Sequence, residues 1–172
     1  MTERELEEYR ALRATIRQRG TARPWAFVVG LGTWAIVTLA TTQVSLPLVT
    51  VLPLLLLAAT FEVVFALHVG VERIGRYLQV FYEDKWEQTV MAFGQPLSGA
   101  DPLFTLLFGL ATVCNFVPVL LAEPVRVELA VLGGAHALLL VRLAVARQAA
   151  GKQRAADLER FRSLLSERQR QQ

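Results

Sequence analysis

Glu62 is the residue whose type and position most directly suggest chemistry, because it lies inside an apolar run. The run, residues 48–70, reads LVTVLPLLLLAATFEVVFALHVG and carries one carboxylate near its middle. A charged side chain at the centre of a membrane helix costs roughly 2.5–3.5 kcal/mol, so ionisable groups in such positions are candidates for ion pathways or for pairing with a cation. Glu62 is therefore the first candidate functional residue.

Three further polar residues lie in apolar runs: Asn115, His136 and Arg142. At ~1.5 Å per residue, Glu62 lies about 12 Å from the C-terminal end of its run. His136 and Arg142 lie about 16 Å and about 7 Å from the C-terminal end of theirs. We predict that Glu62 faces the interior of a helix bundle and pairs with Arg142 or hydrogen-bonds His136, because an unpaired carboxylate there would be protonated. Three alternatives stay open: a neutral Glu62 that only holds helices together, a proton or ion pathway, and exposure to lipid or a partner subunit.

Recognisable catalytic patterns are missing from the sequence. It contains no HExxH, GxSxG, P-loop, CxxC or Rossmann glycine pattern, and its two histidines, His68 and His136, lie 68 residues apart. The single cysteine, Cys114, excludes an intrachain disulfide and a cysteine-based metal cluster. We therefore expect no enzymatic activity, no metal and no cofactor.

The apolar runs that carry these residues are long enough to cross a bilayer. Of the 172 residues, 53% are hydrophobic and the mean hydropathy is +0.39, which is typical of membrane proteins. A spanning helix needs about 20 mainly apolar residues. We predict four spans, at residues 25–42, 48–70, 103–121 and 127–146. Because the linkers within the first and second pairs are very short, we predict two antiparallel hairpins.

Amphipathic segments flank these spans. Residues 1–24 carry an apolar stripe at helical spacing, and Gly20 and Pro24 are expected to end that helix. We predict a second amphipathic helix over residues 71–93 and a third over the tail, residues 147–172, where it extends the last span. The fold class is therefore an all-α polytopic membrane protein with amphipathic cytoplasmic helices.

The distribution of basic residues predicts the orientation. Of the 18 Lys and Arg residues, 17 lie in the two tails, the central loop or the last turns of the fourth span, and Arg126 alone lies in the linker between spans three and four. Because cytoplasmic segments carry the excess of Lys and Arg, we predict that both termini are cytoplasmic. Bases of the tail alternate with acids and glutamines, so we expect no nucleic-acid partner. The expected partners are the lipid bilayer and either a second copy or another membrane or cytoplasmic protein.

Two segments resemble a type of small bacterial integral membrane protein with four spans and no assigned activity. They are EEYRALRATIRQR before the first span and HVGVERIGRYLQVFYEDKWE after the second, which itself contains a proline. The resemblance implies a bacterial inner membrane and a functional cytoplasmic surface made of Arg73, Arg76, Tyr77, Glu83, Trp86 and Glu87. Packing of that helix under the bundle would explain the same residues without a function.

Two functions agree with these features. The first is a non-enzymatic membrane scaffold or sensor module that acts through its cytoplasmic helices and oligomerisation. The second is a small channel or transporter subunit with a proton or ion pathway through Glu62. A wet cavity that reaches Glu62 would favour transport, whereas a dry, packed core would favour the scaffold.

Overall fold

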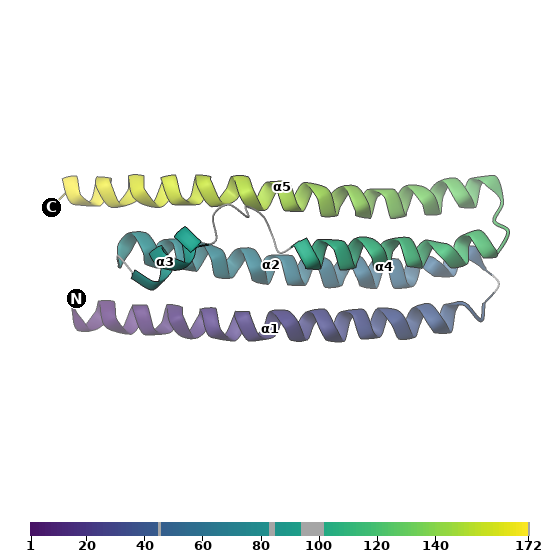
Figure 1. Cartoon of the computed structure of the whole chain (residues 1–172), viewed down its shortest axis with the longest axis horizontal. Helices are drawn as coiled ribbons and strands as arrows, with labels where there is room; N and C mark the ends of the chain where they lie inside the picture. The colour runs from purple at the N-terminus through teal and green to yellow at the C-terminus, as the bar shows by residue number, and fades with distance from the viewer. Residues whose placement is uncertain (45, 83–84, 94–101, 172) are drawn as a thin grey trace. The chain divides into compact units, whose positions relative to one another are not determined.

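The computed structural model describes residues 1–44, 46–82, 85–93 and 102–171, and it is helical almost throughout (Figure 1). The elements, in chain order, are α1 (Glu3–Thr41), the 3-10 helix η1 (Pro47–Thr50), α2 (Val51–Phe81), α3 (Lys85–Phe93), α4 (Pro102–Leu121) and α5 (Arg126–Arg170). For these residues the all-α class predicted from the sequence is confirmed.

The chain divides into two compact units. Unit 1 consists of Met1–Arg23, Ala66–Ala100 and Gln148–Gln172, and unit 2 consists of Pro24–Phe65 and Asp101–Arg147. Three continuous helices, α1, α2 and α5, contribute residues to both units, whereas α3 belongs to unit 1 and α4 to unit 2. Each unit is described separately below.

Four helical segments are long and apolar enough to cross a membrane. They are α1, the continuous segment Pro47–Phe81 formed by η1 and α2, the stretch Phe104–Leu121 of α4, and α5. The 20 residues of α4 rise about 30 Å, which is the thickness of the hydrocarbon layer. This finding suggests a multi-pass membrane protein, in agreement with the composition.

Exposed large apolar side chains concentrate in unit 2. Among the described residues, unit 1 exposes Met1, Trp86 and Leu164, whereas every helix of unit 2 exposes several such side chains. Exposure of so large an apolar area to water is unfavourable. The surface of unit 2 therefore suits contact with lipid chains or with another apolar surface.

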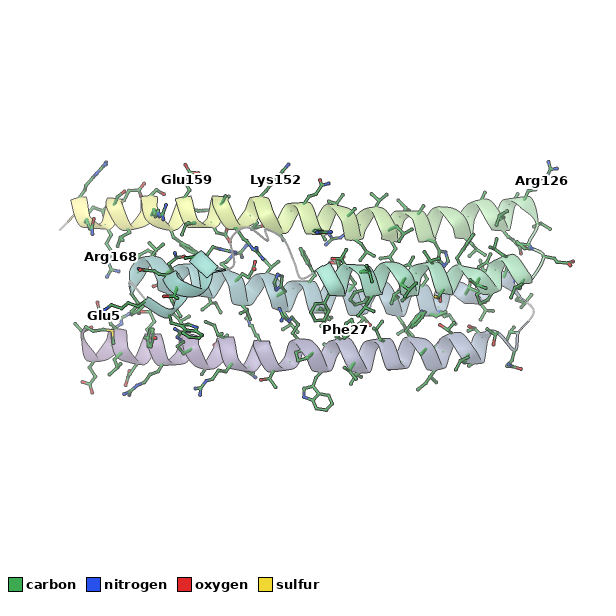
Figure 2. All side chains as sticks on the ribbon, viewed as in Figure 1. Glu5, Phe27, Arg126, Lys152, Glu159 and Arg168 are labelled. Carbon is green, nitrogen blue, oxygen red and sulfur yellow. The ribbon has the colours of Figure 1, made fainter. Side chains whose placement is uncertain are left out.

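The core of unit 2 joins α1, α2, α4 and α5. Its buried members are Leu54, Leu57, Phe61, Val64, Phe108, Ala111, Leu139, Leu143 and Ala146. Phe27 points from α1 toward this core (Figure 2), and its ring lies edge-on to Phe104 at 4.8 Å and to Phe108 at 5.6 Å between centroids. Aromatic pairs of this geometry add to the free energy gained by burial.

Gly30 lies at a close approach between α1 and α2 in unit 2. A Cβ atom built on Gly30 would lie 2.1 Å from Cγ2 and 2.4 Å from Oγ1 of Thr60 on α2, whereas one on Gly32 would meet nothing within 4 Å. Small residues at a helix interface let two membrane helices approach closely. Of the two glycines in span one, Gly30 alone therefore lies at a contact in the described structure.

The first helix is longer than the sequence suggests, because α1 runs through both Gly20 and Pro24. The prediction of a break there is wrong. Proline removes the one hydrogen bond that its N–H would give to the carbonyl of Gly20. Contacts hold the helix before and after this point: Arg23 Nη1 lies 2.9 Å from Nδ1 of His68 in unit 1, and Phe27 packs into the core of unit 2.

The predicted helix over 71–93 is divided in the structure. Its first part continues α2 as far as Phe81, and α3 begins separately at Lys85. The apolar spacing continues through both parts, so hydrophobic periodicity alone did not reveal the boundary. The tail does extend the fourth span as one helix, as predicted, since α5 reaches Arg170.

Candidate functional site

Glu62 and Arg142 form a two-pronged ion pair within unit 2. Nε of Arg142 lies 2.8 Å from Oε1 of Glu62, and Nη2 donates to Oε2 at 2.8 Å. This fork-on-fork arrangement is the strongest geometry available to an arginine and a carboxylate. Of the two partners predicted for Glu62, Arg142 is the one that it contacts, whereas His136 has other partners.

The orientation of the pair differs from the prediction. Its side chains are 50% (Glu62) and 41% (Arg142) exposed on the surface of unit 2, instead of facing the bundle interior. The buried positions of α2 include Leu57, Phe61 and Val64, and Glu62 lies about 100° around the helix from Phe61. Glu62 is therefore adjacent to the buried face and outside it.

Two aromatic rings of α2 support the arginine. The guanidinium carbon of Arg142 lies 5.7 Å from the ring centroid of Phe61 and 5.4 Å from that of Phe65. A cation over an aromatic face is attracted by the ring quadrupole, and more strongly where water is excluded. Arg142 is thus fixed on the surface of α2 by charge and by ring contacts together.

Asn115 is the centre of a second, buried polar cluster in unit 2. Its side chain is fully buried. Its Nδ2 lies 3.2 Å from the backbone oxygen of Thr50 and 3.0 Å from Nε2 of His136, and its Oδ1 accepts from Nε1 of Trp34 at 3.2 Å. Nδ1 of His136 lies 2.7 Å from the backbone oxygen of Leu132. We call these residues the Asn115 hub.

The donor and acceptor roles in the hub are fixed by its chemistry. An indole N–H only donates, so the atom of Asn115 that faces Trp34 must be the oxygen. The amide nitrogen then donates to Thr50 and to His136, so Nε2 of His136 accepts and Nδ1 carries the proton toward the Leu132 carbonyl. The hub is therefore a closed set of neutral groups that joins α1, η1, α4 and α5.

Unit 1 contains a network of ion pairs around Arg76, which is only 2% exposed. Nη2 of Arg76 lies 3.1 Å from Oδ2 of Asp157 on α5, and Nη1 lies 3.6 Å from Glu72 on its own helix. Glu72 also binds Arg154 of α5 with two contacts, and Asp157 also binds Arg73 at 3.3 Å. These charges connect α2 to α5.

The same region of unit 1 connects α2 to α1. Arginine only donates, so Nδ1 of His68 accepts from Arg23 and Nε2 carries the proton, 3.5 Å from Glu72. A Cβ atom on Gly70 would lie 2.6 Å from Nη1 of Arg19, so the absence of a side chain at Gly70 makes room for that guanidinium. Arg19 and Arg23, which lie one turn apart on α1, therefore both pack against α2.

Tyr77 joins all three long helices of unit 1. Its hydroxyl donates to Oε1 of Glu8 on α1 at 2.8 Å, and its ring lies 5.7 Å edge-on from Phe161 of α5. Burial and the hydrogen bond to Glu8 raise the pKa of Tyr77 to about 12. Beside it lies a surface hollow of about 660 Å³ that Glu8, Tyr82 and Arg168 help to line. The phenol stays protonated at physiological pH and holds α1 on α2.

The predicted cytoplasmic surface also included Trp86, Glu83 and Glu87. Trp86 is exposed near the start of α3. Glu87 belongs to α3 but its side chain lies outside the described structure, and Glu83 lies outside the described residues. Arg73, Arg76 and Tyr77 are instead engaged with α1 and α5. Half of the predicted surface is therefore a packing region of unit 1.

Comparisons with protein-family models, with curated proteins and with solved structures find no match. In the described part of the chain, no group of three or more His, Cys, Asp or Glu side chains could hold a metal ion.

Several contact residues were not singled out from the sequence. They are Trp34, Thr50, Glu72, Arg154, Asp157 and Glu8. Thr50 contributes a backbone oxygen, which no side-chain pattern reveals. Asp157 and Arg154 could be found from the sequence, because both lie within one helical turn of Leu158, which belongs to the apolar face of the tail. Charged residues beside a buried face are expected to be paired.

Proposed function

We propose that this protein is a non-enzymatic membrane module that works by assembly. Unit 2 anchors the chain in the bilayer, and unit 1 forms a helical surface in the cytoplasm for a second copy or another protein. Both termini are cytoplasmic in this proposal, because the tails carry most of the basic residues. The proposed membrane is a bacterial inner membrane, which the resemblance of two segments to small bacterial membrane proteins implies.

The closed polar groups inside unit 2 carry this proposal. In the described part of unit 2, every buried side-chain nitrogen and oxygen has a hydrogen-bond partner. A proton or ion pathway needs polar groups that exchange partners with water or with the ion as it passes. The groups of the Asn115 hub are instead hydrogen-bonded to one another, and Glu62 and Arg142 are bonded to each other, as expected of an anchor.

Flux measurements on reconstituted protein test this proposal. We expect proteoliposomes with the wild-type chain to show the same proton and cation flux as protein-free vesicles, both under a pH gradient and under a membrane potential. A protonophore added at the end confirms that the vesicles hold the gradient. A flux that Glu62→Gln abolishes would contradict the proposal and favour the channel or transporter hypothesis.

A further inference from the structure

The Glu62–Arg142 pair interrupts an otherwise apolar surface of unit 2. On α2, Leu55 and Ala59 lie seven and three residues before Glu62 and are exposed on the same side of the helix. On α5, exposed side chains surround Arg142 at helical spacing: Leu138, Val141 and Val145. We call these seven residues the paired-charge surface.

The pair has hydrogen-bonding capacity that the described residues of its own chain do not use. The two bonds employ Nε and Nη2 of Arg142, which leaves the two N–H groups of Nη1 and further lone pairs on both oxygens of Glu62. Both side chains are about half exposed, so this capacity faces away from unit 2. Inside the hydrocarbon layer, polar groups without a partner are strongly unfavourable.

The chemistry of the surface indicates which partner meets it. A lipid phosphate requires net positive charge, whereas the pair is neutral and its exposed neighbours on α2 and α5 are aliphatic. A second copy carries the same pair. A two-fold rotation places the same patch on both sides of an interface, so each Glu62 can face the Arg142 of the other chain.

We propose that the paired-charge surface is the contact between two copies of this chain, in which Glu62 of each copy accepts from Arg142 of the other. The two internal pairs then form a ring of four alternating charges, and the aliphatic residues pack around them. This inference rests on the proposed function, and it adds a contact between copies in unit 2 to the cytoplasmic surface of unit 1.

A charge swap tests the contact directly. In the double variant Glu62→Arg/Arg142→Glu, each chain keeps an internal pair, and two swapped chains keep complementary charges across the interface. A swapped chain beside a wild-type chain places like charges opposite each other twice. Two differently tagged full-length chains are co-expressed in each combination, and the amount of the second chain recovered with the first is measured in mild detergent.

The inference predicts equal recovery for wild type with wild type and for swap with swap, and roughly tenfold lower recovery for the mixed combination, because like charges across an interface are strongly unfavourable. Equal recovery in all three combinations would overturn the proposed surface while leaving self-association intact. Failure of wild type to recover wild type would contradict self-association and with it this inference, and would leave assembly with another protein as the form of the proposed function.

A cross-linking experiment keeps the inference testable if the swapped chain does not fold. Cysteine is introduced at Val141 in a Cys114→Ala background, and the matched control carries it at Ile36, which is exposed on α1 and outside the paired-charge surface. Oxidation in the membrane should give disulfide-linked dimers with Val141→Cys, several-fold more than with Ile36→Cys. Equal or reversed yields would overturn the proposal.

Discussion

Asn115 illustrates how much of unit 2 depends on single residues. One amide meets α1 through Trp34, η1 through Thr50 and α5 through His136. The indole of Trp34 can only donate to Asn115, and the carbonyl of Thr50 can only accept from it. Rotation of the amide by 180° would exchange its oxygen and nitrogen, and both hydrogen bonds would be lost. This residue therefore specifies one arrangement of the four segments.

Replacing Asn115 with leucine should destabilise the protein by about 2 kcal/mol, because several hydrogen bonds are lost and each is worth roughly 0.6 kcal/mol or more between membrane helices. Thermal unfolding of the full chain in detergent measures the effect. Val113→Leu, at an exposed position of the same helix, is the control and should stay within about 0.5 kcal/mol of wild type. Equal stability of the two variants would show that the hub is not structural.

Arg76 and Arg73 provide a second matched comparison, because both bind Asp157 but differ in burial. The Arg76 side chain is 3% exposed and that of Arg73 is 52% exposed. Arg76→Met should cost about 3 kcal/mol, since it removes the buried cation between Glu72 and Asp157, whereas Arg73→Met should cost less than about 1 kcal/mol. Denaturant unfolding followed by circular dichroism distinguishes the two, and similar losses for both would refute this assignment.

Several of these residues could be found from the sequence, because a polar side chain in an apolar run needs a partner. The depths of the polar residues in their runs limited the predicted partner of Glu62 to Arg142 or His136, and Arg142 is the partner in the structure. Their exposure could not be predicted, since the run around Glu62 is apolar on all sides and no alternation of polar and apolar residues marks its buried face. The acceptor on Thr50 is a backbone atom, which is the same in every residue type.

At the scale of the helices, the contact of α1 with α2 in unit 2 depends on Gly30. The side chain of Thr60 occupies the space where a Cβ atom on Gly30 would lie. Gly32, only two residues away, faces open space. Both glycines lie in the first predicted span, and the sequence does not distinguish which of them lies at the contact.

Gly30→Ala should destabilise the protein by roughly 1–3 kcal/mol, because overpacking forces α1 or Thr60 to move. Gly32→Ala is the control, and it should be neutral or stabilising by up to about 1 kcal/mol, since alanine is the better helix former. Thermal unfolding midpoints of the two variants give the comparison. A Gly30→Ala variant as stable as Gly32→Ala would contradict the close approach.

The boundaries of the helices were harder to predict than their existence. Gly20 and Pro24 are ordinary signals for a helix end, yet contacts within each unit hold α1 together through both. The loss of one hydrogen bond at a proline is a local cost that tertiary packing can exceed. Local sequence signals therefore predicted that these helices exist, whereas tertiary packing determined where they end.

Across the whole molecule, charge and apolar exposure separate between the two units. Exposed large apolar side chains belong mainly to unit 2, whereas most charged residues belong to unit 1, where Lys152 and Glu159 are exposed on α5 (Figure 2). Composition and hydropathy predicted this division because the solvent selects side-chain polarity directly. They could not predict the function, since the polar contacts that support the proposal arise only in the folded chain.

Assembly in a bilayer is the central claim of this account. Single-molecule photobleaching of the singly labelled full-length chain in lipid vesicles, at decreasing protein-to-lipid ratio, tests it most directly. The account predicts that two-step bleaching persists on dilution well beyond the level expected from random co-occupancy of vesicles. One-step bleaching that follows random occupancy at every ratio would contradict it.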